Sequence, residues 1–140
     1  MKIYFAASIR GGREDQNKYN ELIRLLSSKV EVLTEHVGDS SLGQTGEKDL
    51  SDKEIYQRDI EWLESADAVI AEVTNPSLGV GYEMGIAEKL GKPILCLSDD
   101  VNHNSNLSAM ISGNHKITTF RYTSLDKAKE GIKDFLNSII

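Results

Sequence analysis

The run Pro76-Ser77-Leu78-Gly79-Val80-Gly81-Tyr82-Glu83 places a hydroxyl group and two glycines directly before a carboxylate. It lies between an apolar stretch over residues 68–73, which predicts a strand, and a helical pattern that reaches Leu90. A strand-to-helix junction presents free backbone N–H groups and the positive end of a helix dipole. The run therefore predicts an anion site with Glu83 beside it. The alternative is an ordinary helix cap, although glycine is costly in the first helical turns unless backbone must approach something.

A second segment suited to anions follows the first apolar stretch of the chain. It consists of Ala7, Ser8, Ile9, Arg10, Gly11, Gly12 and Arg13. Its glycines allow backbone to approach a ligand closely, its arginines match the geometry of phosphate, and its successive N–H groups can form an anion nest. The segment is neither a Walker motif nor G-x-G-x-x-G. A plain strand-to-helix turn with solvated arginines therefore stays open as the alternative.

Asp59 lies within an apolar stripe of a predicted helix. Residues of this stripe recur at helical spacing as Ile55, Asp59, Trp62 and Ala66. A carboxylate there must be paired, hydrogen-bonded or protonated, unless the edge of the stripe is exposed and Asp59 is solvated. Arg58 is adjacent in sequence but is expected to point elsewhere on the helix. Together with Glu83, Asp59 suits glycosidic chemistry, in which one carboxylate attacks the sugar carbon and the other protonates the leaving group. Retaining enzymes hold such a pair about 5–5.5 Å apart.

Two further side chains are weaker candidates. The hydroxyl of Tyr4, in the first predicted strand, can reach an acid, although most strand tyrosines serve packing. His36 follows the second predicted strand at the same sheet edge, where a lone histidine is more often structural or exposed than catalytic. The histidines at 36, 103 and 115 lack metal-ligand spacing, so we expect no metal.

The elements that must position these residues alternate along the chain. Strand patterns cover residues 2–7, 30–34, 68–73, 94–97 and 116–122, and helical patterns cover 14–28, 50–65, 78–90 and 125–139, with one helical turn over 107–111. Polar loops are expected at 38–48 and 99–106. Ser51 is expected to cap a helix with Glu54 as its capping-box partner, and Gly91 is expected to end a helix shortly before Pro93.

This alternation predicts an α/β, Rossmann/flavodoxin-like fold in which about five mostly parallel strands lie between helices. We expect residues 1–140 to form a single domain. Crossovers should be right-handed, and a ligand should bind beyond the carboxyl ends of the strands, near the point where strand order reverses.

Composition narrows the class of partner. The formal net charge of −6 argues against binding to a nucleic acid polymer or an anionic membrane. Cys96 is the only cysteine, which excludes an intrachain disulfide and a Cys-rich zinc site, and its apolar strand indicates a core residue rather than a reactive thiol. Apolar runs are too short to span a bilayer, and we expect no signal segment. We expect a cytoplasmic protein, or also a nuclear one if the source is eukaryotic.

On these residues the chain resembles the 2′-deoxynucleoside 5′-monophosphate N-glycosidases, within the nucleoside 2-deoxyribosyltransferase superfamily. The matching segments are Tyr4–Asp15, Leu33–Val37, Asp59–Leu63 and Ala71–Glu83, in order within residues 3–112. The first loop and the run that ends at Glu83 are specific in combination. Ala6-Ala7 departs from the Cys-Gly of vertebrate members, and residues 98–106 also differ. Ala7 still allows close approach, with a narrower φ range than glycine.

The resemblance implies hydrolysis of the N-glycosidic bond of a deoxynucleotide, giving a free base and 2-deoxyribose 5-phosphate without a cofactor. Glu83 would be the nucleophile at C1′, kept ionised with help from the helix dipole, and Asp59 the acid that assists departure of the base. Tyr4 would orient Glu83 and crowd the 2′ side of the sugar.

The resemblance also implies the binding residues. The 5′-phosphate would be held by Ser8, Arg10, Ser77 and Gly79, and the base pocket would be lined by Ile9, His36 and Met110. Ser108 would reach the phosphate of the neighbouring subunit, which implies a homodimer with shared active sites.

Three alternative functions stay open. A nucleoside 2-deoxyribosyltransferase would need no phosphate site, so Arg10 and Ser77 argue against it. A ribonucleotide hydrolase is disfavoured by the crowding from Tyr4 at the 2′ position. A non-catalytic nucleotide-binding sensor would leave Glu83 dispensable.

Overall fold

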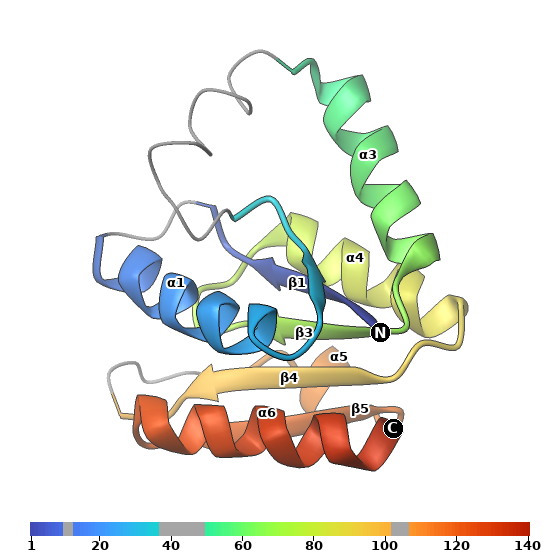
Figure 1. Cartoon of the computed structure of the whole chain (residues 1–140). Helices are drawn as coiled ribbons and strands as arrows, with labels where there is room; N and C mark the ends of the chain where they lie inside the picture. The colour runs from blue at the N-terminus through green and yellow to red at the C-terminus, as the bar shows by residue number, and fades with distance from the viewer. Residues whose placement is uncertain (10–12, 37–49, 102–106) are drawn as a thin grey trace.

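Five parallel strands form one sheet in the order β2-β1-β3-β4-β5 (Figure 1). The computed structural model describes residues 1–9, 13–36, 50–101 and 107–140. The strands are β1 (Lys2–Ala7), β2 (Glu31–Leu33), β3 (Ala68–Glu72), β4 (Ile94–Asp99) and β5 (Ile117–Tyr122). The predicted α/β fold is confirmed, and the sheet is parallel throughout.

Helices cover both faces of this sheet (Figure 1). They are α1 (Arg13–Ser27), α3 (Asp52–Ser65), α4 (Leu78–Lys89), the short α5 (Ala109–Ser112) and α6 (Leu125–Ile139). Successive strand residues point to opposite faces. Ile3 and Phe5 of β1 therefore pack with α1 and α6, whereas Tyr4 and Ala6 pack with α3 and α4. Among the described residues, no helix has the length and apolarity needed to cross a membrane.

Local signals set most element boundaries correctly. Ser51 and Glu54 form the predicted capping box at the start of α3, and Gly91 has a φ of 73° just after α4. The strand predicted over 30–34 is shorter, because only Glu31–Leu33 pair with β1. The strand predicted over 94–97 instead continues to Asp99, because its pairing with β5 extends to the pair of Asp99 and Tyr122.

The strand order reverses at β1, which has β2 on one side and β3 on the other. Ala7, the last residue of β1, lies in register with Glu72, the last residue of β3. Crevices at such switch points receive ligands in open parallel sheets. Several predicted features lie outside the described residues: Arg10, Gly11, Gly12, the loop over 38–48 and part of the loop over 99–106.

Two helix-interior glycines differ in the space around them, which gives a stability prediction. A Cβ on Gly131 in α6 would lie 2.8 Å from Cδ1 of Phe120, whereas a Cβ on Gly85 in α4 would meet nothing within 4 Å. In open space, replacing a helical glycine by alanine stabilises by about 0.5–1 kcal/mol. Overpacking costs roughly 1–3 kcal/mol. Gly131→Ala should therefore lower the free energy of unfolding in urea and Gly85→Ala should raise it. Equal stabilisation by both substitutions would contradict the packing of α6 on β5.

Candidate functional site

A cavity of about 270 Å³ lies beside the carboxyl end of β1, between residues of α3 and α4. Its lining includes Ala7 and Ile9 at the end of β1, Asp59 of α3, and Ser77, Gly79 and Glu83 at the start of α4. The two carboxylates singled out from the sequence therefore face the same cavity. The cavity lies where strand order reverses, as expected for a ligand site in this class of sheet.

Glu83 lies in the second turn of α4, and Ser77 caps that helix by accepting a hydrogen bond from the N–H of Val80. The pKa of Glu83 is raised to about 7, mainly by burial and in part by the charge of Asp59. A hydrogen bond from the Tyr4 hydroxyl, together with the charge of Arg58, lowers it. The helix dipole expected to keep Glu83 ionised acts mainly within the first turn. The effect of burial on the pKa of Glu83 therefore outweighs that of the helix dipole.

Tyr4 is fully buried beside Glu83 and keeps its proton. Burial, followed by the charge of Glu83, raises the pKa of Tyr4 far above its usual range. The hydroxyl thus acts as a donor to Glu83, which confirms that this strand tyrosine reaches an acid. Its ring also lies near that of Trp62, with the centroids 6.4 Å apart.

Asp59 is 7% exposed, so the solvated alternative does not apply. Its Oδ1 lies 3.1 Å from Nε and 3.0 Å from Nη2 of Arg58. The expectation that Arg58 points elsewhere is wrong. Its flexible side chain folds along the helix, with the guanidinium carbon 4.5 Å from the centre of the Trp62 ring. This stacking holds the cation beside Asp59.

Glu35 and Asp52 are further carboxylates of the cavity that the sequence pattern did not identify, and Glu35 is the one that contacts Asp59. Its Oε1 lies 3.4 Å from Nη2 of Arg58, and its side chain is hydrogen-bonded to Asp59. Burial, then this hydrogen bond and the charges of Asp59 and Glu83, raise the pKa of the Glu35 carboxyl to about 9 against the opposing charge of Arg58. Glu35 therefore holds a proton at neutral pH and donates it toward Asp59. The available signal was its position two residues after β2, at the carboxyl edge of the sheet.

The other predicted binding residues occupy different places. Ser8 is buried at the end of β1. His36 is buried behind that strand end, where its Nε2 lies 2.9 Å from the carbonyl oxygen of Ala7 and its ring packs edge-on against Tyr19. Ser108 caps α5, and Met110 is exposed on the same helix. The described lining of the cavity includes neither His36 nor these two residues.

The glycines of the predicted anion run also differ from each other. Gly79 lines the cavity, and a Cβ placed there would lie 3.8 Å from Oγ of Ser77 and 3.9 Å from Oε1 of Glu83. Gly81 is exposed and would meet nothing within 4 Å. Gly79 is therefore the position at which a missing side chain leaves room beside the carboxylate.

The arrangement combines two chemical capacities in one cavity. Glu83, with a pKa of about 7, is available as a carboxylate near neutral pH. The Glu35–Asp59 pair shares a proton at the same pH. Together they supply a nucleophile and a proton source, as bond cleavage with a leaving group requires.

The chain is similar in sequence and in fold to known proteins. A family model described as nucleoside 2-deoxyribosyltransferase matches residues 3–127. The chain is 45% identical over 141 residues to a 5-hydroxymethyl-dUMP N-hydrolase of Tetraodon nigroviridis, covering 99% of both chains. It is 48% identical to the Mus musculus protein of that name, covering 96% of this chain and 77% of the other. A CMP N-glycosidase structure from Clostridium botulinum has the same fold, with a TM-score of 0.73, 20% identity, and coverage of 95% and 98%.

Proposed function

The chain belongs to the nucleoside 2-deoxyribosyltransferase family, and on that basis we propose that it hydrolyses the N-glycosidic bond of 2′-deoxynucleoside 5′-monophosphates. The products are a free base and 2-deoxyribose 5-phosphate. The observation that carries the proposal is the meeting of Glu83 with the proton-holding pair of Asp59 and Glu35 in one cavity. Relatives named as N-hydrolases of a deoxynucleoside monophosphate support hydrolysis over transfer.

Glu83 is the nucleophile in this proposal. Its carboxylate attacks C1′ while the bond from C1′ to the base nitrogen breaks, which leaves the deoxyribosyl group as an ester on Glu83. A pKa of about 7 leaves about half of the Glu83 side chains ionised at neutral pH. The hydrogen bond from Tyr4 orients the attacking carboxylate.

Asp59 delivers the proton to the departing base, and Glu35 resupplies it. Glu35 holds a proton at neutral pH and is hydrogen-bonded to Asp59. As the base leaves, the proton on the shared bond moves to Asp59, and Asp59 protonates the base. Water then attacks C1′ of the ester and returns one proton to the pair, which frees Glu83.

The substrate is held at both ends of the cavity. The phosphate is assigned to the start of α4 and to the segment after β1, through Ser8, Arg10, Ser77 and Gly79, with Ala7, Gly11, Gly12 and Arg13 adjoining. Of the residues that the resemblance implies for the base, Ile9 lines the cavity and is assigned to the base, whereas His36 and Met110 lie outside the described lining. Tyr4 crowds the 2′ position, which favours deoxyribose. Because relatives are named for 5-hydroxymethyl-dUMP, a modified pyrimidine nucleotide is included among the substrates.

A homodimer with shared active sites is part of the proposal. Ser108 is exposed and lies outside the described lining of its own cavity, so it is available to a neighbouring one. Leu78, at the start of α4, is 98% exposed, and Tyr56 and Tyr82 at the cavity are also exposed. Burying such apolar side chains against a second copy would be favourable.

The first test of the function compares substrates. Incubation with dGMP, 5-hydroxymethyl-dUMP, deoxyguanosine and GMP should release free base from the two deoxynucleotides and little from the others, as followed by chromatography. Glu83→Ala should lower the rate on the order of 10³-fold or more, since no ester can form. Glu61→Ala, which removes an exposed acid of α3, is the control and should retain full activity.

Several outcomes would contradict this assignment. Release from deoxyguanosine but not from dGMP would remove the phosphate requirement. A new deoxynucleotide formed on addition of free adenine would indicate a transferase. Full activity of Glu83→Ala would support the sensor alternative.

The proton supply predicts a pH dependence. Because Glu35 has a pKa of about 9, wild-type kcat should fall as pH rises through that value and Glu35 loses its proton. Glu35→Gln keeps the shape of the side chain but has no acidic proton to supply to Asp59. The kcat of this variant should therefore fall about 10²-fold, and the decline of kcat at alkaline pH should disappear. Glu64→Gln, at an exposed position of α3, should keep the wild-type profile. An unchanged alkaline decline in Glu35→Gln would assign that decline to another group.

Mixed dimers test the shared site. If each site takes Glu83 from one subunit and Ser108 from the other, Glu83→Ala and Ser108→Arg dimers should both be impaired. A 1:1 mixture that exchanges subunits should then regain about a quarter of wild-type activity, because half of the dimers are mixed and each has one intact site. Sedimentation velocity should show the dimer. Sites built within single subunits would regain nothing on mixing.

A further inference from the structure

We infer that Lys18 and Glu72 are positioning residues for phosphate binding: the ion pair between partly buried Lys18 and fully buried Glu72 fixes residues 74–77 against the start of α1. The assignment of phosphate to these segments rests on the proposed function. Neither residue is among those that line the cavity of Glu83 and Asp59. Their effect must therefore act through the segments that they hold.

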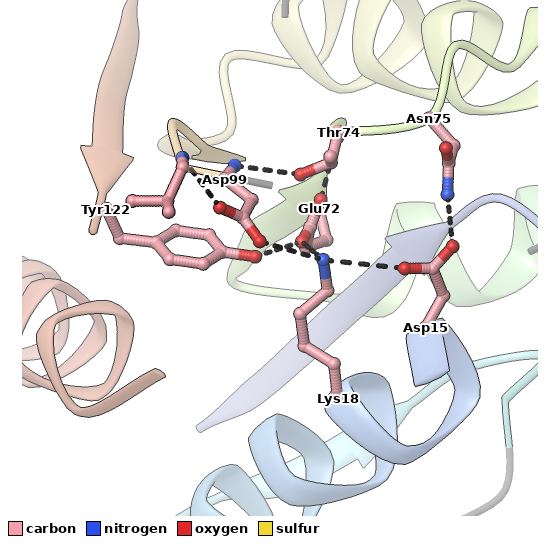
Figure 2. Close-up of polar contacts among 8 residues, drawn as sticks. Asp15, Lys18, Glu72, Thr74, Asn75, Asp99 and Tyr122 are labelled. Atoms are coloured by element: carbon pink, nitrogen blue, oxygen red, sulfur yellow. Dashed lines mark hydrogen bonds and ion pairs between the residues drawn. The ribbon is translucent and has the colours of Figure 1, made fainter. Parts of the chain in front are cut away.

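Glu72 lies at the centre of the carboxyl edge of the sheet (Figure 2). It is the last residue of β3, is 0% exposed, and lies in register with the end of β1 and with Leu97 of β4. Its Oε2 lies 3.0 Å from Nζ of Lys18 and accepts a 2.5 Å hydrogen bond from the hydroxyl of Tyr122. A buried carboxylate requires such partners, because its lost hydration must be replaced.

The same carboxylate holds the segment that leads to the proposed phosphate site. Oε1 of Glu72 accepts a 2.7 Å hydrogen bond from the N–H of Thr74, and Oγ1 of Thr74 accepts one of 2.8 Å from the N–H of Asp99. Pro76 follows with a fixed φ, so little freedom remains before Ser77 caps α4. These contacts fix the position of the start of α4 relative to the ends of β3 and β4.

Lys18 connects this arrangement to the other phosphate segment. It lies in α1, which begins directly after residues 8–12, and its Nζ is also 3.7 Å from Oδ1 of Asp15. Oδ2 of Asp15 in turn accepts a 2.6 Å hydrogen bond from Nδ2 of Asn75 (Figure 2). The start of α1 and residues 74–75 are thus joined twice, once through Asp15 and once through Lys18 and Glu72.

A purely stabilising role does not account for this design. Replacing a buried ion pair by apolar residues of similar volume is often neutral or stabilising, so the pair is weak evidence for stability. A network with fixed donor and acceptor geometry instead specifies where two backbone segments lie. Anion binding by backbone N–H groups and hydroxyls depends on that placement, and small displacements weaken it.

Steady-state kinetics with dGMP distinguish a positioning role of Lys18 and Glu72 from a purely stabilising one. Glu72→Gln and Lys18→Met should each raise KM on the order of 10-fold while kcat stays within about threefold, because phosphate contacts are displaced and the carboxylates of the cavity are not. The double variant should raise KM by less than the product of the single effects, since the residues act as a pair. Lys127→Met, which removes an exposed ion pair with Glu130 on α6, is the matched control and should leave both constants unchanged.

Two kinetic results would overturn the inference: an unchanged KM in folded Glu72→Gln, or a fall in kcat with KM unchanged. If Glu72→Gln does not fold, Asn75→Ala removes the tie to Asp15 without leaving a buried charge, and it should raise KM about threefold. An unchanged KM in that variant would also overturn the inference.

A binding measurement keeps this inference separate from the proposed reaction. If the wild-type protein releases no guanine, the proposed function fails, and thermal unfolding in inorganic phosphate decides the positioning role. Phosphate should then raise the Tm of wild type and of Lys127→Met more than that of Glu72→Gln. Equal shifts in all three proteins, or no shift in wild type, would overturn the inference.

Discussion

The structure depends on holding several carboxylates together at the carboxyl edge of a parallel sheet. Arg58 lies beside both Glu35 and Asp59, and Lys18 lies beside Glu72, Asp15 and Asp99. Each cation therefore faces more than one acid. In the Arg58 cluster the excess is relieved by protonation, because burial and mutual repulsion raise the pKa of Glu35 and Glu83. In the Lys18 cluster, neutral donors from Thr74 and Tyr122 complete the shell of Glu72.

The pleat of the sheet keeps these two clusters apart. Ala68 and Ile70 of β3 pack with α1 and α6, and Glu72 follows them on that face, where Lys18 meets it. Tyr4 and Val69 pack on the opposite face with α3 and α4. The titrating cluster that borders the cavity of Glu83 is thus separated by one layer of backbone from the Lys18 cluster on the other face of the sheet. The first is suited to moving protons and the second to holding the segments around it.

How much the sequence predicted depended on whether a feature is local. The helical stripe identified Asp59 as an acid among apolar residues, because helical spacing alone places Asp59 against the core. Glu35 follows a strand of three residues, which is too short to show a periodicity. The direction of the Arg58 side chain depends on its torsion angles and on its contact with the Trp62 ring, and a helical projection includes neither. Glu72 belongs to an apolar strand pattern, and its partner Tyr122 is 50 residues away, so only the folded sheet joins them.

Coupling between the carboxylates gives the proposed reaction its timing. The negative charge of Glu83 is one of the causes that raise the pKa of Glu35, so an ionised nucleophile helps the Glu35–Asp59 pair to retain its proton. When Glu83 becomes an ester, that charge disappears and the pair holds its proton less tightly. The proton thus becomes available as the departing base gains electron density. Hydrolysis of the ester restores the charge on Glu83, and with it the affinity of Glu35 for the proton that water releases. In the proposed reaction, the charge of Glu83 in this way couples proton delivery to nucleophilic attack.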